Sequence, residues 1–367
     1  MNTLKIIHAA DLHLDSRFES LKPEDANRRR EMARNILPRL AEAAVSRGAQ
    51  ALVISGDVFE SDNVTPETVH ELCRSFGALN IPVIISTGNH DPYSPGCIWD
   101  RISLPENIHL FNSEQISPLT ISGLNTRFWG AGFTASFCPP LLKNFSVGEK
   151  LKGIFDVLVL HGDLNTGSDY CPITRQELEA SGVDYAALGH IHQRSELAVS
   201  GKTAFAYPGC AEGRGFDELG EKGCYFVTIS EEGATAEFVS LSAVSYVIQK
   251  IDVGGKKLVE ALRAVTVDYS DNHYVRIILC GEVSAPIDLV ALRRELEGSF
   301  AELQIYDETT IATDLWADME GDDLSALFRR KLRALYDSAE SADEREKIEL
   351  AVRLGLEALK GEGGQKL

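Results

Sequence analysis

No stretch of this sequence is apolar for long enough to cross a membrane, because a transmembrane helix needs roughly 18 to 20 successive apolar residues. The first residues, MNTLKIIHAADLH, also lack the basic segment and the long apolar segment of a secretory signal peptide. The 7 cysteines are odd in number and include no CxxC pair, which favours reduced thiols over a disulfide framework. We therefore expect a cytoplasmic protein without a membrane partner.

Basic residues are also scarce: 36 Lys and Arg stand against 55 Asp and Glu, which gives a formal net charge of -19 at pH 7. A surface with this balance does not attract nucleic acid by itself, because Lys and Arg make most contacts with phosphate backbones. The contents of 44% hydrophobic and 25% charged residues are those of a globular protein. With 367 residues, the chain can form one large domain with attachments or two domains.

The first half of the chain predicts alternating strands and helices. Five short apolar runs, LKIIHAA, ALVIS, PVIIS, FDVLVL and DYAAL, predict buried strands. Residues 23–45 predict a helix that Pro38 kinks or interrupts. Residues 66–79 predict a second helix, with Thr65 as its N-cap and Pro66 at its first position. We expect a further strand pair around AFAYPG and KGCYFVTIS, and the whole pattern predicts an α/β layered domain.

The pattern changes after residue 242. Residues 246–311 have the order strand, helix, strand, helix, strand, which predicts a small α+β unit. From residue 314 onward the pattern is helical only. A leucine-rich stripe within residues 324–335 either packs in a core or forms a docking face for a partner. We therefore predict three regions, which span residues 1–242, 243–313 and 314–367.

Each of the five apolar runs ends in side chains that can bind metal ions. In open α/β sheets, ligands gather outside the carboxyl ends of the strands, so residues far apart in the sequence can meet at one edge. The candidate ligands are Asp11 and His13 in ADLH, Asp57 in SGD, Asn89 in GNHD, His161 in LHGD, and His190 and His192 in GHIH. Imidazole, carboxylate and amide donors together suit Mn, Fe or Zn better than Ca, which prefers oxygen alone.

These candidates exceed what one ion needs. Asp57, in the middle of the set, could bridge two ions about 3.5 to 4 Å apart, an arrangement that activates a water and clamps a phosphoryl group. His90 would then be spare, and its imidazole could protonate a leaving oxygen, with Asp91 to orient it. Arg194 and Arg214 follow the last motif and are candidates for substrate binding through a phosphate.

In this order, the motifs DLH, GD, GNHD, LHGD and GHIH resemble those of the calcineurin-like metallophosphoesterase superfamily. The phrases DLHLDS, GDVFES and GHIHQ, followed by YPG, resemble its DNA-repair exonuclease branch, which includes SbcD-type nuclease subunits and the bacterial YhaO-like proteins. Asp15 and Glu60 replace the Gly and Asp of many nuclease members, a difference that we interpret as one of subfamily. The resemblance implies an α/β fold: a two-sheet sandwich flanked by helices, a small α+β capping domain and a C-terminal helical tail.

The resemblance also implies how two divalent ions are held. Mn²⁺ is the expected metal, with Fe, Zn or Mg as alternatives. One ion would take Asp11, His13, Asp57 and His192, and the other would take Asp57, Asn89, His161 and His190, with His90 as the catalytic histidine. Members of this branch act on DNA with a coiled-coil, SMC-like ATPase bound through the C-terminal helical region, and nuclease relatives commonly form homodimers.

Three functions remain open at this point. The motifs and the cap-plus-tail organisation favour a dinuclear phosphodiesterase, a 3′–5′ DNA exonuclease subunit that acts in DNA repair with an ATPase partner. The acidic composition favours a phosphatase or phosphodiesterase for a small nucleotide or phosphomonoester, since phosphate contacts supply much of the affinity for DNA. The third function is a binding module in which the metals or the cap only organise a complex.

Overall fold

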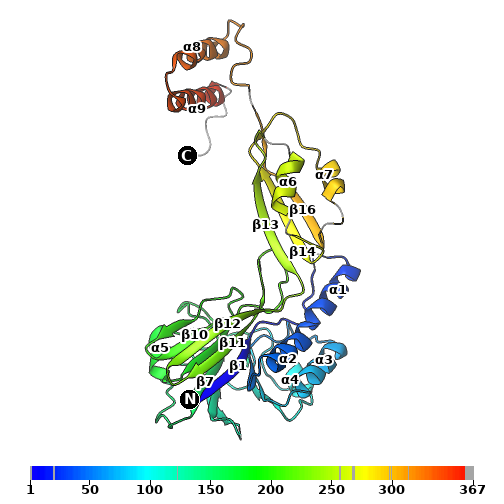
Figure 1. The fold of residues 1–367 in the computed structure, drawn as a ribbon, viewed down its shortest axis with the longest axis vertical. Helices are drawn as coiled ribbons and strands as arrows, with labels where there is room; N and C mark the ends of the chain where they lie inside the picture. The colour runs from blue at the N-terminus through cyan, green and yellow to red at the C-terminus, as the bar shows by residue number, and fades with distance from the viewer. Residues whose placement is uncertain are drawn as a thin grey trace. The chain divides into compact units, whose positions relative to one another are not determined.

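The computed structural model describes residues 2–19, 21–121, 123–255, 258–266, 269–296, 298, 300–312 and 314–359, with the backbone alone for residues 263–266 (Figure 1). The chain divides into two compact units. The first consists of Met1–Gln249, Val267–Ile277 and Leu296–Gln304, and the second of Lys250–Thr266, Ile278–Glu295 and Ile305–Leu367. The division expected at residues 242 and 313 stays a prediction.

Two six-stranded sheets form the centre of the first unit. The first sheet has the order β12-β11-β1-β2-β3-β4 and the second the order β5-β6-β7-β8-β10-β9. The first sheet contains β1 (Thr3–Ala9), β2 (Ala51–Ser55), β3 (Val83–Ser86), β4 (Ile108–Phe111), β11 (Gly223–Ser230) and β12 (Gly233–Ser240). The second contains β5 (Ser117–Thr120), β6 (Thr126–Gly130), β7 (Phe155–His161), β8 (Tyr185–Gly189), β9 (Ala198–Ser200) and β10 (Thr203–Ala206). Strands β1 to β4 are parallel, as are β6, β7, β8 and β10.

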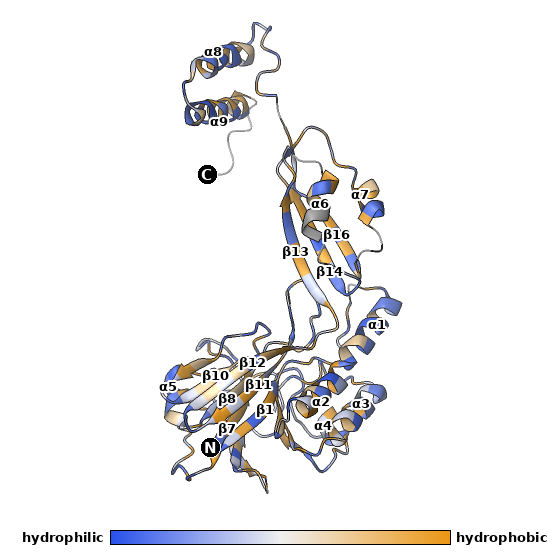
Figure 2. Cartoon of the chain, viewed as in Figure 1, coloured by the Kyte–Doolittle hydropathy of each residue, from blue (hydrophilic) through white to orange (hydrophobic). Residues whose placement is uncertain are grey.

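Three apolar layers hold these sheets together, and Figure 2 shows the apolar residues concentrated on the central strands. The layer between the sheets includes Ile6, Val53, Ile84, Val157, Val159 and Ala187. A second layer packs α2 (Ile36–Ser46) and α3 (Pro66–Gly77) on the outer face of the first sheet, and a third packs α5 (Arg175–Ser181) on the outer face of the second. Strands covered on both faces are apolar along almost their whole length, as in ALVIS. The predicted sandwich of two sheets flanked by helices is confirmed.

The helix expected over residues 23–45 is two helices, α1 (Pro23–Arg34) and α2, and the break is at Asn35 rather than at Pro38. Proline lacks an N–H, and its ring clashes with the carbonyl of the residue four positions earlier, here Arg34. The first helix therefore ends ahead of the proline, which lies in the first turn of α2. The hydroxyl of Thr65 caps α3, as predicted, by accepting a hydrogen bond from the amide of Thr68 at 3.4 Å.

The expected strand pair around AFAYPG and KGCYFVTIS is wrong as a pair. β10 belongs to the second sheet, between β8 and β9, whereas β11 belongs to the first sheet, between β12 and β1. Residues 207–222, which link the two strands, lead the chain from one sheet to the other. Local sequence patterns predict a strand, but they do not specify which strand it pairs with.

Residues 245–311 contain the predicted order of strand, helix, strand, helix and strand. The elements are β13 (Ser245–Asp252), α6 (Leu258–Thr266), β14 (His273–Cys280), β15 (Glu282–Val283), α7 (Leu289–Leu296), β16 (Glu302–Asp307) and β17 (Thr310–Ile311). Strands β13, β14 and β16 form one sheet, and β15 pairs with β17. The chain then forms the helix pair α8 (Leu324–Ser338) and α9 (Ala342–Leu359), which packs around Val352 and Leu356. None of the described helices is both long and apolar enough to cross a membrane.

Candidate metal centre

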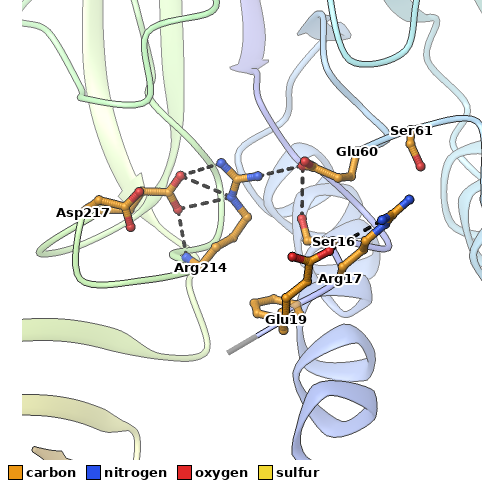
Figure 3. Close-up of a pocket in the computed structure, with 9 residues that line it drawn as sticks. Ser16, Arg17, Glu19, Glu60, Ser61, Arg214 and Asp217 are labelled. Carbon is orange, nitrogen blue, oxygen red and sulfur yellow. Dashed lines mark hydrogen bonds and ion pairs between the residues drawn. The ribbon is translucent and has the colours of Figure 1, made fainter. Parts of the chain in front are cut away.

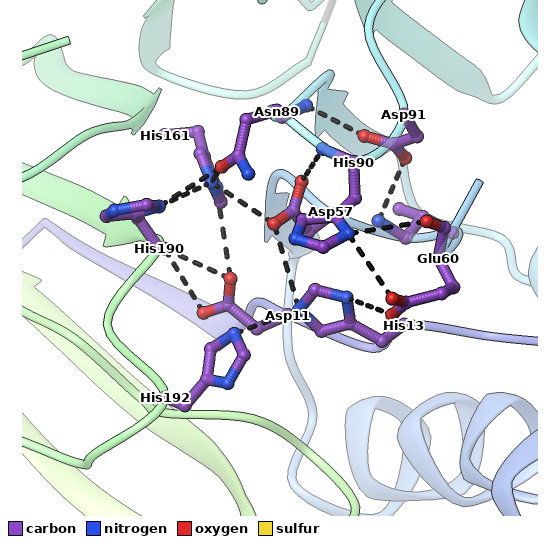
Figure 4. Close-up of polar contacts among 12 residues, drawn as sticks. Asp11, His13, Asp57, Glu60, Asn89, His90, Asp91, His161, His190 and His192 are labelled. Carbon is purple, nitrogen blue, oxygen red and sulfur yellow. Dashed lines mark hydrogen bonds and ion pairs between the residues drawn. The ribbon is translucent and has the colours of Figure 1, made fainter. Parts of the chain in front are cut away.

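The carboxyl ends of five parallel strands bring the predicted ligands together (Figure 4). Asp11, Asp57 and Asn89 follow β1, β2 and β3 of the first sheet. His161 ends β7 of the second sheet, and His190 and His192 follow β8. We expected convergence at one sheet edge, but the ligands come from two sheets that face each other. This difference lets the side chains approach the same space from opposite sides.

Glycines in the motifs make this close approach possible. A Cβ atom on Gly56, in SGD, would lie 2.2 Å from Nδ1 of His161, and one on Gly88, in GNHD, would lie 2.2 Å from Oδ1 of Asp57. Both positions therefore exclude any larger residue. Asp11, His13 and Asp57 have positive φ angles of 52°, 44° and 50°. Such angles are uncommon for residues other than glycine and concentrate at functional sites.

Asp11, His13 and His192 form the first group of donors, with their nearest ligand atoms close enough to share one ion. The Nε2 atoms of His13 and His192 lie 2.9 Å apart. Nδ1 of His13 lies 2.9 Å from Oε2 of Glu60, and Nδ1 of His192 donates to Oε1 of Glu218 at 2.8 Å. Histidines that bind metals are commonly held in this way, with a carboxylate on the nitrogen that faces away from the ion.

Asn89, His161 and His190 form the second group. Oδ1 of Asn89 lies 2.9 Å from Nε2 of His161 and 3.1 Å from Nδ1 of His190. Nδ1 of His161 donates to the backbone carbonyl of Ser55 at 2.9 Å, which orients the ring so that Nε2 faces the asparagine. Both imidazoles are thus held with a ring nitrogen toward the same amide oxygen.

Asp57 lies between the two groups. Its Oδ2 atom is 3.4 Å from Nε2 of His161 and 3.7 Å from Nε2 of His13, while its Oδ1 atom accepts a hydrogen bond from the amide of His90 at 2.9 Å. One carboxylate oxygen therefore faces both groups, as a carboxylate that bridges two cations would. The bridging role itself stays a prediction.

The charges in this cluster suit a cation. Asp11 and Asp57 are each only 1% exposed. Burial alone would raise the pKa of Asp57, but His161 and His13 lower it below the ordinary range. Burial likewise favours neutral His161, yet Asp57 and Asp11 raise the pKa of this histidine to about 9. The buried carboxylates thus need positive charge beside them, which protonated His161 provides and which a metal ion would provide in place of its proton. The residues therefore fit a metal site.

His90 lies beside the cluster, and Glu60 is the group that contacts it. Nδ1 of His90 is 3.3 Å from the backbone oxygen of Glu60 and 3.4 Å from Oε1 of its carboxylate. This carboxylate raises the pKa of His90. We expected Asp91 to orient His90, and the structure corrects this: Asp91 holds the loop instead. Its oxygens accept hydrogen bonds from three backbone amides, those of Gly88, Val58 and Phe59.

Sequence reasoning missed a network that joins the two carboxylates behind His13 and His192 (Figure 3). Nη1 of Arg214 donates to Oε2 of Glu60 at 2.8 Å, and Nη2 donates to Oε1 of Glu218 at 2.7 Å. Burial opposes the charged guanidinium, but the carboxylate of Glu218 raises the pKa of Arg214. Glu60 was noticed only as a departure from a family pattern, and no motif marks Glu218.

The two arginines proposed as substrate contacts therefore have different surroundings. Arg214 is occupied by the two carboxylates. Arg194 is exposed, and its guanidinium carbon lies 3.9 Å from the centre of the Phe238 ring on β12. The surroundings of these two arginines do not show whether either contacts the substrate, so both assignments stay predictions.

Residues 4–194 match the family of calcineurin-like phosphoesterases. This region contains all five motifs and both sheets' ligand-bearing strands. The chain belongs to the calcineurin-like phosphoesterase family. Phosphoesterases of this family depend on a dinuclear metal centre, and the cluster of histidines and aspartates described above could hold one.

Curated relatives agree with this assignment. The chain is similar to "Uncharacterized metallophosphoesterase YhaO" of Bacillus subtilis, with 33% identity over 71% of this chain and 66% of that protein. It is also similar to "DNA double-strand break repair protein Mre11" of Saccharolobus solfataricus, with 25% identity over 62% of this chain and 61% of that protein. The chain thus covers less than two thirds of the length of these relatives. A solved dimetal phosphatase from Danio rerio aligns at a TM-score of 0.40 with 12% identity, over 65% of this chain and 97% of that structure.

Proposed function

We propose that this phosphoesterase is a two-metal phosphodiesterase that degrades DNA from a 3′ end, as the nuclease subunit of a repair complex. The observation that carries the proposal is the position of Asp57 Oδ2 between two donor groups, with His90 beside them. Two divalent cations, Mn²⁺ in the first place and Fe, Zn or Mg otherwise, would supply Lewis acidity that activates a water and neutralises charge on the phosphoryl group. The names of the Mre11 relatives support DNA as the substrate.

The chain's own residues account for the proton that the leaving oxygen needs. Glu60 lies against Nδ1 of His90 and raises the pKa of this histidine, so the protonated imidazole is favoured. Nε2 then remains as the donor toward the leaving sugar oxygen. The His90 side chain is 38% exposed, which leaves it accessible to a substrate, and Asn89 and His90 line a cavity of about 470 Å³.

A partner would supply the basic surface that this chain lacks. We propose a coiled-coil, SMC-like ATPase, docked on α8 and α9, and a homodimer of this chain within the complex. Apolar side chains exposed on these two helices support the docking site: Leu324, Leu327 and Leu335 are 70%, 51% and 53% exposed, and Leu350 and Leu354 are 56% and 58% exposed. Exposed apolar patches of this kind are typical of interaction surfaces.

The runner-up function is hydrolysis of a small nucleotide or phosphomonoester. A cavity of about 560 Å³ beside the centre favours it. The ionisable residues around this cavity are four acids, Glu19, Glu60, Asp217 and Glu218, and two bases, Arg17 and Arg214. Because Arg214 is already paired with two of these acids, the cavity repels a polyanion more than a small substrate.

The deciding experiment compares three substrates with and without Mn²⁺: linear DNA, a bis-aryl phosphodiester and an aryl monoester. We expect metal-dependent cleavage of DNA and the diester, with little turnover of the monoester. Turnover of the monoester alone would support the runner-up. The Asp57→Asn variant serves as the inactive control. If wild-type protein and this variant were equally inert on all three substrates, the third function, a binding module, would be favoured.

A further inference from the structure

Two stacked aromatic side chains lead from the surface to His190. The Tyr170 ring lies 4.8 Å from the His190 imidazole, centre to centre, with 36° between the planes. The Phe137 ring lies 5.8 Å from Tyr170 at 25°. Phe137 is 61% exposed and is the one phenylalanine among the exposed large apolar side chains of the described residues. The series thus begins at solvent and ends at a candidate metal ligand.

The backbone fixes this pair of rings in place. Cys138 forms a β-bridge with Tyr170: its amide donates to the carbonyl of Asp169 at 3.0 Å, and its carbonyl accepts from the amide of Cys171 at 2.8 Å. Cys138 and Cys171 are buried, at 3% and 0% exposure. The carbonyl of Tyr170 also accepts from the amide of Asp163, two residues beyond His161. The rings are therefore held by the same segment that carries a candidate ligand.

The loop that carries Phe137 lies at the opening of the centre. Ser136 lines the same cavity as Asn89 and His90. Phe137 lines a neighbouring cavity of about 500 Å³, together with Ser168 and Asp169. One loop thus borders the space beside the candidate proton donor and the space beside Phe137.

The residues that line the cavity beside Phe137 favour contact with a nucleobase rather than with a phosphate. The described residues that line the second cavity are Phe137, Cys138, Pro139, Pro140, Ser168, Asp169 and Pro172. None of them is a lysine or an arginine. A phosphate backbone has no positive charge to contact here. A nucleobase, in contrast, stacks on an aromatic ring whatever its identity, because every base has a π-face.

We propose that Phe137 and Tyr170 form a stacking platform for the nucleobase next to the scissile phosphate. The platform makes a base-bearing phosphodiester the preferred substrate class. This inference rests on the proposed phosphodiesterase function and adds what the active site recognises beyond the phosphate. The same aromatic pair would serve a strand end of DNA or a single nucleotide diester.

The test compares two diesters with one leaving group, thymidine 5′-(p-nitrophenyl phosphate) and methyl p-nitrophenyl phosphate. Phe137→Ala should lower kcat/KM for the thymidine ester by about 5- to 100-fold, chiefly through KM, because stacking on one ring contributes that much to binding. The methyl ester should change less than about twofold, since it has no base to stack. Phe137→Trp should retain the preference. Leu151→Ala, at a side chain that is 49% exposed and outside both cavities, is the matched control.

A binding measurement separates this inference from the proposed activity. The fluorescence of a 2-aminopurine trinucleotide should be quenched by His90→Gln protein, which keeps the metal-binding residues but turns over slowly, and Phe137→Ala in that background should abolish the quenching. The platform would be overturned if Phe137→Ala lowered kcat/KM equally for both esters, or if the quenching persisted after Phe137→Ala. If the quenching depends on Phe137 but wild-type protein cleaves no diester, the platform is supported and the proposed function is refuted.

Discussion

The two halves of the metal centre are held by different kinds of contact. His13 and His192 are backed by the carboxylates of Glu60 and Glu218, which share Arg214. His161 is backed by a backbone carbonyl, that of Ser55. Side chains can be replaced and their charges changed, whereas a carbonyl inside a sheet cannot. One half of the centre therefore depends on an ionic network and the other on the fold itself.

Removal of the side chain common to both halves should have the largest effect. We expect Asp57→Asn to lower kcat on a phosphodiester on the order of a thousandfold or more, because the charge stabilisation that metal ions give is worth several kcal/mol. Elemental analysis should show a loss of bound metal from both halves. If the Asp57→Asn variant keeps full activity and two bound ions, Asp57 does not bridge the two ions.

His90→Gln should affect catalysis without affecting either half. Loss of a proton donor typically lowers kcat by about 10²- to 10⁴-fold, and the variant keeps the amide that donates to Asp57. Isothermal titration with Mn²⁺ should give the wild-type affinity and stoichiometry. If metal binding and turnover fell together, His90 would be a ligand rather than the proton donor.

Arg214→Gln should weaken the first half alone. Without the guanidinium, Glu60 and Glu218 lose their shared partner, and loss of such an outer contact typically lowers metal affinity by about 10- to 100-fold. A chelator titration should then release one ion well before the other. Arg74→Gln, which removes an arginine paired with Glu71 on the surface of α3, is the control. Equal weakening of both ions would contradict the division into two halves.

Ser55→Ala should show the smallest effect on metal binding. The serine hydroxyl donates to the carbonyl of Ala187 at 2.9 Å, so its removal should lower the free energy of unfolding by about 1 kcal/mol. The carbonyl that holds His161 belongs to the backbone and survives the substitution. Chemical denaturation should detect the stability loss while Mn²⁺ affinity stays at the wild-type value. A large drop in affinity would show that the second half also depends on side chains.

Sequence patterns predict the strands and the convergence of the ligands, because strands and their end motifs are local features, whereas the two-sheet sandwich was implied by the family resemblance. The predicted ligands of both groups do lie together in the structure, although their roles remain predictions. Contacts that no strand-end motif marks were not predictable. Arg214 and Glu60 are separated by 154 positions, and no spacing rule connects them. The expectation that Asp91 orients His90 rests on their adjacency in the chain, whereas the Asp91 side chain accepts hydrogen bonds from backbone amides.

The loops after β1 and β2 are tied to each other. The amide of Asp11 donates to the carbonyl of Gly56 at 3.1 Å, and that of His13 donates to the carbonyl of Asp57 at 3.0 Å. These bonds hold three residues in left-handed conformations that cost about 1 to 3 kcal/mol each when unsupported. Backbone hydrogen bonds that involve no cation therefore fix the positions of these three candidate ligands. Capture of an ion would then be limited by the shedding of its hydration water, with almost no rearrangement of the chain.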